Sequence, residues 1–143
     1  MVNLMEAATV CLALNIYFEA QDQPVEGQIA VSQVVMNRVQ DSRFPDNVCD
    51  VIKQGVHSKN TGFPVRWKCH FSWYCDGKSD TPRHLDSYRW ANFIASYVIS
   101  GDSKDLVNGS THYHAKFVSP NWNIQKTRVT QIGDHIFYRW EKK

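Results

Sequence analysis

The sequence predicts an α+β fold in which helices come first and a small antiparallel sheet comes last. Apolar residues recur at helical spacing in three long segments. These segments span residues 4–20, 24–39 and 82–100. Towards the C-terminus the pattern changes to the two-residue alternation of strands. The alternating segments span residues 110–117, 127–131 and 135–140. Helices and antiparallel strands that are separated along the chain in this way are typical of α+β domains.

The composition is that of a single domain, residues 1–143, with enough apolar side chains for a hydrophobic core. Of the 143 residues, 43% are hydrophobic and 13% aromatic, and this length is usual for one domain. The net charge of +2 is too small to indicate a nucleic-acid-binding protein. No apolar run reaches the ~18 residues of a membrane span. The N-terminus has no basic group ahead of an apolar segment, so we expect no signal peptide and synthesis in the cytoplasm.

The end of the first predicted helix contains Glu19, the main catalytic candidate. Helical spacing places Glu19 on the same face as Leu12 and Ile16, which we expect to pack inward. A carboxylate on such a face loses part of its hydration, and its pKa rises because desolvation disfavours the anion. Glu19 would then hold a proton near neutral pH, as a general acid must. The alternative is an ordinary solvated glutamate in a last helical turn.

The second helix is expected to follow a short polar turn. Asp22 and Pro24 are a helix-start signal, since an acidic cap followed by proline is favoured at the first turn. Residues 41–45 read as the next turn. Asp46 is then expected to cap a short helix that runs to about Gln54.

Residues 55–80 are predicted to form a long loop rich in glycine and aromatic residues. A loop of this length inside a compact domain is usually functional. Its densest part, residues 69–77, contains Phe71, Ser72, Trp73 and Asp76. We weigh two interpretations of this part, the wall of a substrate groove and a loop held only by aromatic packing.

The four cysteines do not form a C-x-x-C pair, which argues against a zinc ribbon or a thioredoxin motif. Cys11 lies in an apolar helical pattern and is predicted to be a small core residue. Cys69 and Cys75 bracket the aromatic loop and could form a disulfide in an oxidising compartment.

The last helix and the sheet have clear boundary signals. Thr81 and Pro82 open the helix, and Gly101 ends it. In residues 110–117 the alternation places Tyr113 on one face. Gly133, with the aspartate after it, is a tight-turn signal that joins the last two strands into a hairpin.

His112 and His114 share the strand face opposite Tyr113. Two histidines at this spacing could bind zinc with a third ligand, but the sequence offers no H-E-x-x-H motif or clustered partner. We therefore favour imidazoles that contact substrate from a groove strand, without a metal. Plain surface histidines are the alternative.

Several segments, in the same order, resemble the cell wall hydrolase family that includes the spore cortex-lytic enzymes of the SleB/CwlJ type. They are LNIYFEA (14–20), PVEGQIAVSQVVMNRV (24–39), FP (44–45), FSW (71–73), CDG (75–77), G (109) with THYH (111–114), and IG (132–133) with H (135) and F (137). The resemblance covers about residues 11–139.

The resemblance implies a lysozyme-like, lytic-transglycosylase-like fold, a helical bundle with a small antiparallel sheet. It implies a domain that acts on peptidoglycan glycan strands, and it places the catalytic glutamate on Glu19. We expect a monomer that needs no cofactor. The residues expected to contact substrate are Tyr17, Phe71, Ser72, Trp73, Asp76, His112, Tyr113 and His114. His112 and His114 stand where the spore enzymes commonly have tyrosines.

One catalytic glutamate suffices if the substrate's own N-acetyl group assists and the muramic C6 hydroxyl attacks, which yields a 1,6-anhydro sugar. The family favours this lytic transglycosylase outcome. If water attacks instead, the enzyme is a muramidase, for which a second carboxylate would be expected. The candidates for it are Asp22, Glu26, Asp76 and Asp134.

Two other classes remain as alternatives. A zinc amidase that cuts the muramoyl–peptide bond would use His112 and His114, and a non-catalytic glycan-binding module would tolerate the loss of Glu19. With no signal peptide and no wall-binding repeat, we expect either a phage-type lysin that reaches the wall after release or an unrecognised export route.

Overall fold

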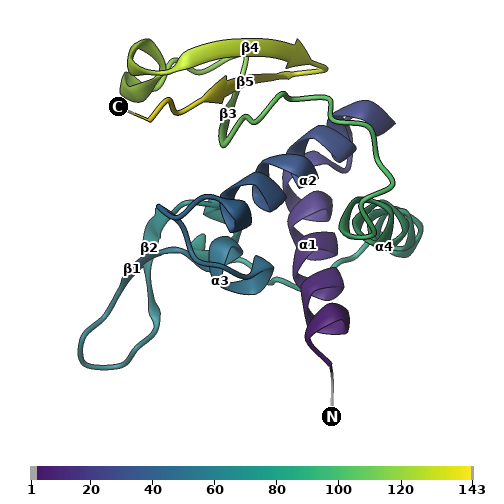
Figure 1. Ribbon diagram of the computed structural model, residues 1–143. Coiled ribbons are helices and arrows are strands. Elements are labelled where there is room, and N and C mark those ends of the chain that lie inside the picture. Colours follow the sequence, from purple (N-terminus) through teal and green to yellow (C-terminus); the bar gives the residue numbers. More distant parts are fainter. Residues whose placement is uncertain (1–2, 143) are drawn as a thin grey trace.

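The computed structural model describes residues 3–142 and is built around its first helix (Figure 1). Helix α1 (Leu4–Ala20) packs against α2 (Val25–Gln40), the short α3 (Val48–Ile52) and α4 (Leu85–Ile99). A three-stranded sheet lies across one end of these helices, and a two-stranded hairpin projects from the other side of the molecule. The expected α+β architecture is confirmed.

Helix α1 has the predicted bounds and the predicted buried face. Asn3 caps it, since its side-chain oxygen accepts a hydrogen bond of 2.8 Å from the backbone N–H of Glu6. Leu12, Asn15 and Ile16 are fully buried. The face that carries Glu19 is therefore the face that packs inward.

The other helices depart from prediction chiefly near their first residues, and α3 ends at Ile52 rather than at about Gln54. Asn47, rather than Asp46, caps α3, because its side chain accepts from the backbone N–H of Asp50. Helix α4 starts at Leu85 rather than residue 82. The buried hydroxyl of Tyr17 accepts the backbone N–H groups of Arg83 and His84 and holds the chain just before α4.

Residues 55–80 are more ordered than predicted. Strands β1 (Gly55–His57) and β2 (Pro64–Cys69) pair antiparallel, and a 3₁₀ helix, η1 (Ser72–Cys75), follows. The prediction of a loop without regular structure was wrong here. Both strands are largely exposed, so they lack the apolar alternation by which a half-buried strand is recognised.

The C-terminal sheet follows the prediction. Strands β3 (His112–Ala115), β4 (Thr127–Ile132) and β5 (His135–Arg139) form an antiparallel sheet in the order β3-β5-β4. The 3₁₀ helix η2 (Asn121–Gln125) lies between β3 and β4. Gly133 turns the β4–β5 hairpin with a φ of 56°, which favours glycine.

A side-chain clamp fixes this hairpin on the helices. Gln23, in the turn between α1 and α2, donates to the carboxylate of Asp134 at 3.0 Å and accepts from the Asp134 backbone N–H at 2.9 Å. The tip of the sheet is thereby held beside the C-terminal end of α1.

Two hydrophobic clusters meet near the C-terminal end of α1. The larger one joins α1, α3, α4 and η1, and the smaller one lies between α2 and the sheet. The smaller cluster consists of Ala20, Ala30, Val31, Val34, Val107 and Phe137. Tyr113 packs against both clusters, so the β3 strand is held directly over the last turn of α1.

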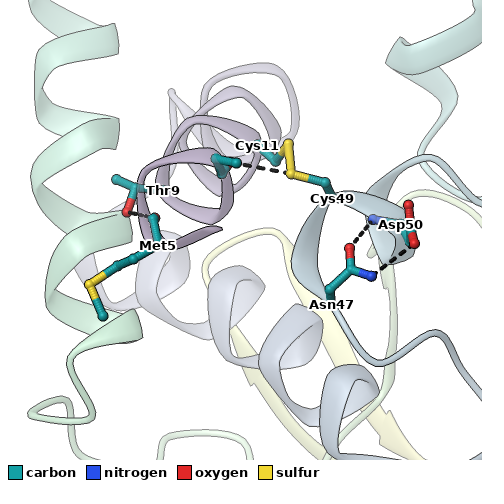
Figure 2. The surroundings of a disulfide bond; sticks show 7 residues. Met5, Thr9, Cys11, Asn47, Cys49 and Asp50 are labelled. Atoms are coloured by element: carbon teal, nitrogen blue, oxygen red, sulfur yellow. Dashed lines mark hydrogen bonds between the residues drawn. A yellow bond between two sulfur atoms is a disulfide. The ribbon is translucent and has the colours of Figure 1, made fainter. Parts of the chain in front are cut away.

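Two disulfides cross-link the chain. Cys11 of α1 packs against the core as predicted, and it is also bonded to Cys49 of α3 (Figure 2), a pairing that the sequence did not indicate. The pattern around Cys11 showed only an apolar helix, and the partner becomes visible only when α3 packs on α1. The second disulfide joins Cys69 to Cys75 and closes the aromatic segment, a pairing that the sequence had indicated as possible. Among residues 3–142, no helix is long and apolar enough to cross a membrane.

Candidate active site

Glu19 and Tyr113 form the centre of the candidate site. Glu19 lies half-buried in the last turn of α1. The hydroxyl of Tyr113, on β3, donates a hydrogen bond of 2.5 Å to Oε1 of Glu19. The bond joins residues 94 positions apart and is a direct polar contact between the sheet and the end of α1.

Burial and two neighbours act in opposite directions on Glu19. Desolvation raises the pKa of Glu19 above its ordinary value, while the hydrogen bond from Tyr113 and the positive charge of Arg38 lower it. The pKa of Tyr113 is raised well above its ordinary value, chiefly by burial and then by the charge of Glu19. Tyr113 therefore remains a neutral donor at physiological pH.

Arg38 is the buried cation of this site. Its Nε donates to the backbone oxygen of Thr111 at 2.7 Å, two residues before Tyr113. Its guanidinium carbon lies 5.0 Å from the ring centroid of Phe44 and 5.2 Å from that of Phe71. Burial lowers the pKa of Arg38 to about 10, so the side chain is still charged at neutral pH.

Glu19 opens into a cleft of about 500 Å³. Four of the residues predicted to contact substrate line it, namely Tyr17, Ser72, Trp73 and Asp76. The remaining lining residues are Phe18, Gln21, Lys78, Ser79, Thr81, Arg83 and His84. The cleft thus lies between the end of α1 and the segment that runs from η1 towards α4.

Trp73 shapes the cleft while belonging largely to the core. Only 7% of its surface is exposed, its Nε1 donates to Oδ1 of Asn15 at 2.8 Å, and its ring stacks on Phe18 with centroids 4.9 Å apart. Tyr17 is also buried. These rings fix η1 against α1 and present limited surface to a ligand.

His112 and His114 do share one strand face, and that face is turned away from Glu19. Both rings lie against Trp122, with centroids 5.3 and 5.7 Å away. His114 is buried, and its two ring nitrogens lie 2.8 Å from the backbone oxygen of Ala115 and 2.8 Å from the hydroxyl of Tyr138. Neither histidine lines the 500 Å³ cleft.

Phe71 is likewise buried, beneath Arg38, and lies outside the lining of this cleft.

Burial, followed by the charge of Arg38 and other nearby cations, lowers the pKa of His112 to about 3. His112 is therefore neutral between pH 5 and 8.

Asp76 is the one candidate for a second carboxylate that lines the cleft. Asp22 and Glu26 are exposed, and Asp134 forms an ion pair of 3.0 Å with Lys116. Within residues 3–142, no group of three or more His, Cys, Asp and Glu side chains is arranged to hold a metal ion.

Functional roles for Arg38 and Asn15 were not predicted from the sequence. A signal for both was present, because Arg38 continues the buried stripe of Val31, Val34 and Val35 on α2, and Asn15 lies between buried residues of α1. A polar residue on an apolar helical face is rarely buried without a specific partner.

Comparison with known proteins agrees with this fold. A sequence profile described as Cell Wall Hydrolase matches residues 22–138 and begins three positions after Glu19. A spore cortex-lytic enzyme of Oceanobacillus iheyensis is 46% identical over 133 residues, which cover 88% of this chain and 39% of that protein. A spore cortex-lytic enzyme of Halalkalibacterium halodurans is 27% identical over 127 residues, which cover 88% of this chain and 33% of that protein. The chain thus spans between a third and two fifths of the length of these relatives.

Two solved structures share the fold. The catalytic domain of the germination-specific lytic transglycosylase SleB from Bacillus anthracis has a TM-score of 0.65 and 22% identity, and covers 92% of this chain and 93% of its own. The catalytic domain of the Bacillus cereus SleB protein has a TM-score of 0.61 and 23% identity, and covers 93% and 91%. With a profile match over most of its length and a fold shared with these domains, the chain belongs to the Cell Wall Hydrolase family.

Proposed function

We propose that this protein is a peptidoglycan-degrading enzyme that cleaves the bond between N-acetylmuramic acid and N-acetylglucosamine as a lytic transglycosylase. Glu19 acts as its general acid and then as its general base. The observation that carries the proposal is a half-buried carboxylate that receives a 2.5 Å hydrogen bond from Tyr113 and lines a 500 Å³ cleft. The names of the relatives and of the SleB structures support the substrate class.

In the first step Glu19 donates a proton to the glycosidic oxygen. Burial favours the protonated form of Glu19 that this step requires. Since Tyr113 occupies Oε1 as a donor, Oε2 carries the proton that is transferred. The bond from the muramic C1 to that oxygen then breaks, and the N-acetylglucosamine side leaves as an alcohol.

In the second step the ionised Glu19 accepts the proton of the muramic C6 hydroxyl. The C6 oxygen bonds to C1, which closes the 1,6-anhydro ring and restores the proton to Glu19 without consuming water. Tyr113 and Arg38 stabilise the carboxylate that exists between the two steps, because one donates a hydrogen bond to it and the other is a buried cation. A single carboxylate is sufficient for this cycle.

The position of Asp76 favours a second candidate function, hydrolysis of the same bond. It is half-buried, lines the same cleft as Glu19, and accepts a hydrogen bond of 2.9 Å from the backbone N–H of Lys78. If Asp76 oriented a water molecule, the same cleavage would end in a reducing sugar, which is the muramidase outcome.

The two disulfides support action outside a reducing compartment, since such bonds persist in oxidising environments. We infer that the enzyme reaches the cell wall after release or export and binds the glycan as a monomer.

Mass analysis of the fragments released from purified peptidoglycan tests the proposal. Anhydro-muropeptides are expected. Reducing muropeptides would assign the muramidase reaction instead, and free stem peptides would assign an amidase, for which loss of activity with a chelator is the further check. If a correctly folded sample released no fragment, the protein would be a non-catalytic glycan-binding module. The Glu19→Gln protein, prepared in parallel, controls for contaminating hydrolases.

A further inference from the structure

A second cavity, larger than the Glu19 cleft, lies on the other side of η1. It has a volume of about 680 Å³ and is formed by α3, the β1–β2 hairpin and the segment after β2. We propose that this cavity binds the carboxylates of the stem peptides that branch from the same glycan strand. The inference rests on the proposed function, since it assigns the peptide part of that substrate to a place on the protein.

The two hollows share one wall. His70 and Tyr74 line the second cavity, while Ser72 and Trp73, which lie between them along the chain, line the Glu19 cleft. The rings of Trp73 and Tyr74 meet edge to face with centroids 6.0 Å apart. The Cys69–Cys75 disulfide ties the two ends of this wall together. A branch that leaves a glycan in the cleft therefore has the second cavity as its neighbour.

The charge of the cavity suits an anionic ligand. Lys53 and Lys68 line it and are both exposed, and neither forms an ion pair with any residue between 3 and 142. The one carboxylate in the lining, that of Asp50, accepts a hydrogen bond of 2.8 Å from the side chain of Asn47. The lining therefore has two lysines outside any ion pair of the described residues and a single carboxylate that already has a donor.

The rest of the lining favours a peptide over a bare phosphate polymer. Pro45, Val56 and Tyr74 contribute apolar surface to the lining. Such surface can pack against the aliphatic atoms of a short peptide while its carboxylates contact the ammonium groups. Stem peptides carry both chemical features, whereas a polyphosphodiester offers mainly charge.

The test compares one enzyme on two forms of one substrate. Soluble glycan strands are prepared with their stem peptides and, from the same batch, after an amidase has removed them. The variant Lys53→Gln/Lys68→Gln is compared with Lys104→Gln/Lys142→Gln, which removes the same charge from exposed lysines that do not line either hollow.

We expect the ratio of kcat/KM on peptide-bearing strands to kcat/KM on stripped strands to fall about 5- to 10-fold in the cavity variant. This magnitude corresponds to about 1.0–1.4 kcal/mol in total, or about 0.5–0.7 kcal/mol for each of two exposed charge pairs. The ratio should stay at the wild-type value in the control variant, and added salt should reduce the wild-type preference.

An unchanged ratio in the cavity variant overturns the inference, as does an equal loss on both forms of the strand. A preference that follows attached wall phosphate polymer rather than the stem peptides also overturns it. Failure of the wild-type protein to cleave either form refutes the proposed glycosidic activity itself, so the two proposals fail in distinguishable ways.

Discussion

The hydroxyl of Tyr113 lies 2.5 Å from Oε1 of Glu19 and connects the C-terminal sheet to the end of the first helix. This bond stabilises the ionised carboxylate, whereas burial stabilises the protonated one. A group held between these two effects can give up a proton and take one back, which is the requirement for a single residue that serves as acid and base.

Replacing Glu19 with glutamine should abolish activity and preserve the fold. The substitution is nearly isosteric, so it removes the transferable proton with little change in packing, and a loss of ~10²-fold or more is expected for a general acid. Cell wall digestion and the melting temperature are measured together. Glu26→Gln is the matched control, because Glu26 is exposed at the start of α2. Digestion by Glu19→Gln at the wild-type rate would refute the assignment.

Replacing Tyr113 with phenylalanine should move the alkaline limb of the pH–activity profile to higher pH. The hydrogen bond from Tyr113 lowers the pKa of Glu19, so its removal raises that pKa. The acid form of Glu19 then persists to higher pH, although the rate itself falls because the carboxylate intermediate loses a donor. The profile of kcat/KM between pH 4 and 9 checks this prediction. Tyr97→Phe, on the exposed part of α4, should leave the profile in place. An alkaline limb that moves to lower pH in Tyr113→Phe would contradict the assigned role.

Replacing Trp73 with phenylalanine should lower stability more than it lowers catalysis. The change removes the buried hydrogen bond to Asn15, whose side-chain Nδ2 already has no partner among residues 3–142, and leaves Oδ1 unpaired as well. An unsatisfied buried group costs about 1–3 kcal/mol. Denaturant unfolding measures the difference, with Trp90→Phe as a partly exposed control. Equal stabilities for the two variants would show that the bond to Asn15 contributes little.

Reduction of the disulfides should lower the melting temperature. Cys11 and Cys49 are 38 positions apart and join α1 to α3 (Figure 2). A cross-link of this kind restricts the unfolded chain and contributes roughly 2–4 kcal/mol. Thermal unfolding of the wild type and of Cys11→Ser/Cys49→Ser is compared with and without reductant. If reductant shifts the double variant as much as the wild type, the stabilisation comes from the other disulfide.

Stability should fall as the pH drops from about 6.5 towards 3, and His112 should account for part of that fall. The pKa of His112 in the folded protein is about 3, whereas an unfolded histidine titrates near 6.5. Between these values the unfolded chain binds the extra proton, so protonation favours unfolding. Free energies of unfolding at pH 7 and 4.5 are measured for the wild type and His112→Gln. The difference between the two pH values should shrink in His112→Gln and persist in His57→Gln, since His57 is exposed. A difference that is equally large in His112→Gln would show that His112 does not carry this dependence.

Local patterns along the chain are sufficient to predict the helices, the final hairpin and the candidate acid. Helical spacing placed Glu19 on a face with Leu12 and Ile16, and these two residues are fully buried. Gly133 was recognised as a turn because few other residues adopt its backbone conformation. Such features depend on neighbours within a few positions, which periodicity and turn chemistry report directly.

The remaining features required the folded chain. Tyr113 reaches Glu19 only because β3 crosses the end of α1, the charge of Arg38 acts on Glu19 only because α2 packs on α1, and Cys11 meets Cys49 only because α3 packs on α1. The alternation in β3 separated Tyr113 from His112 and His114, but it could not show which face was turned towards Glu19. Alternation specifies that two faces differ, whereas the packing of distant elements decides what each face contacts, and that packing depends on contacts between residues far apart in the sequence.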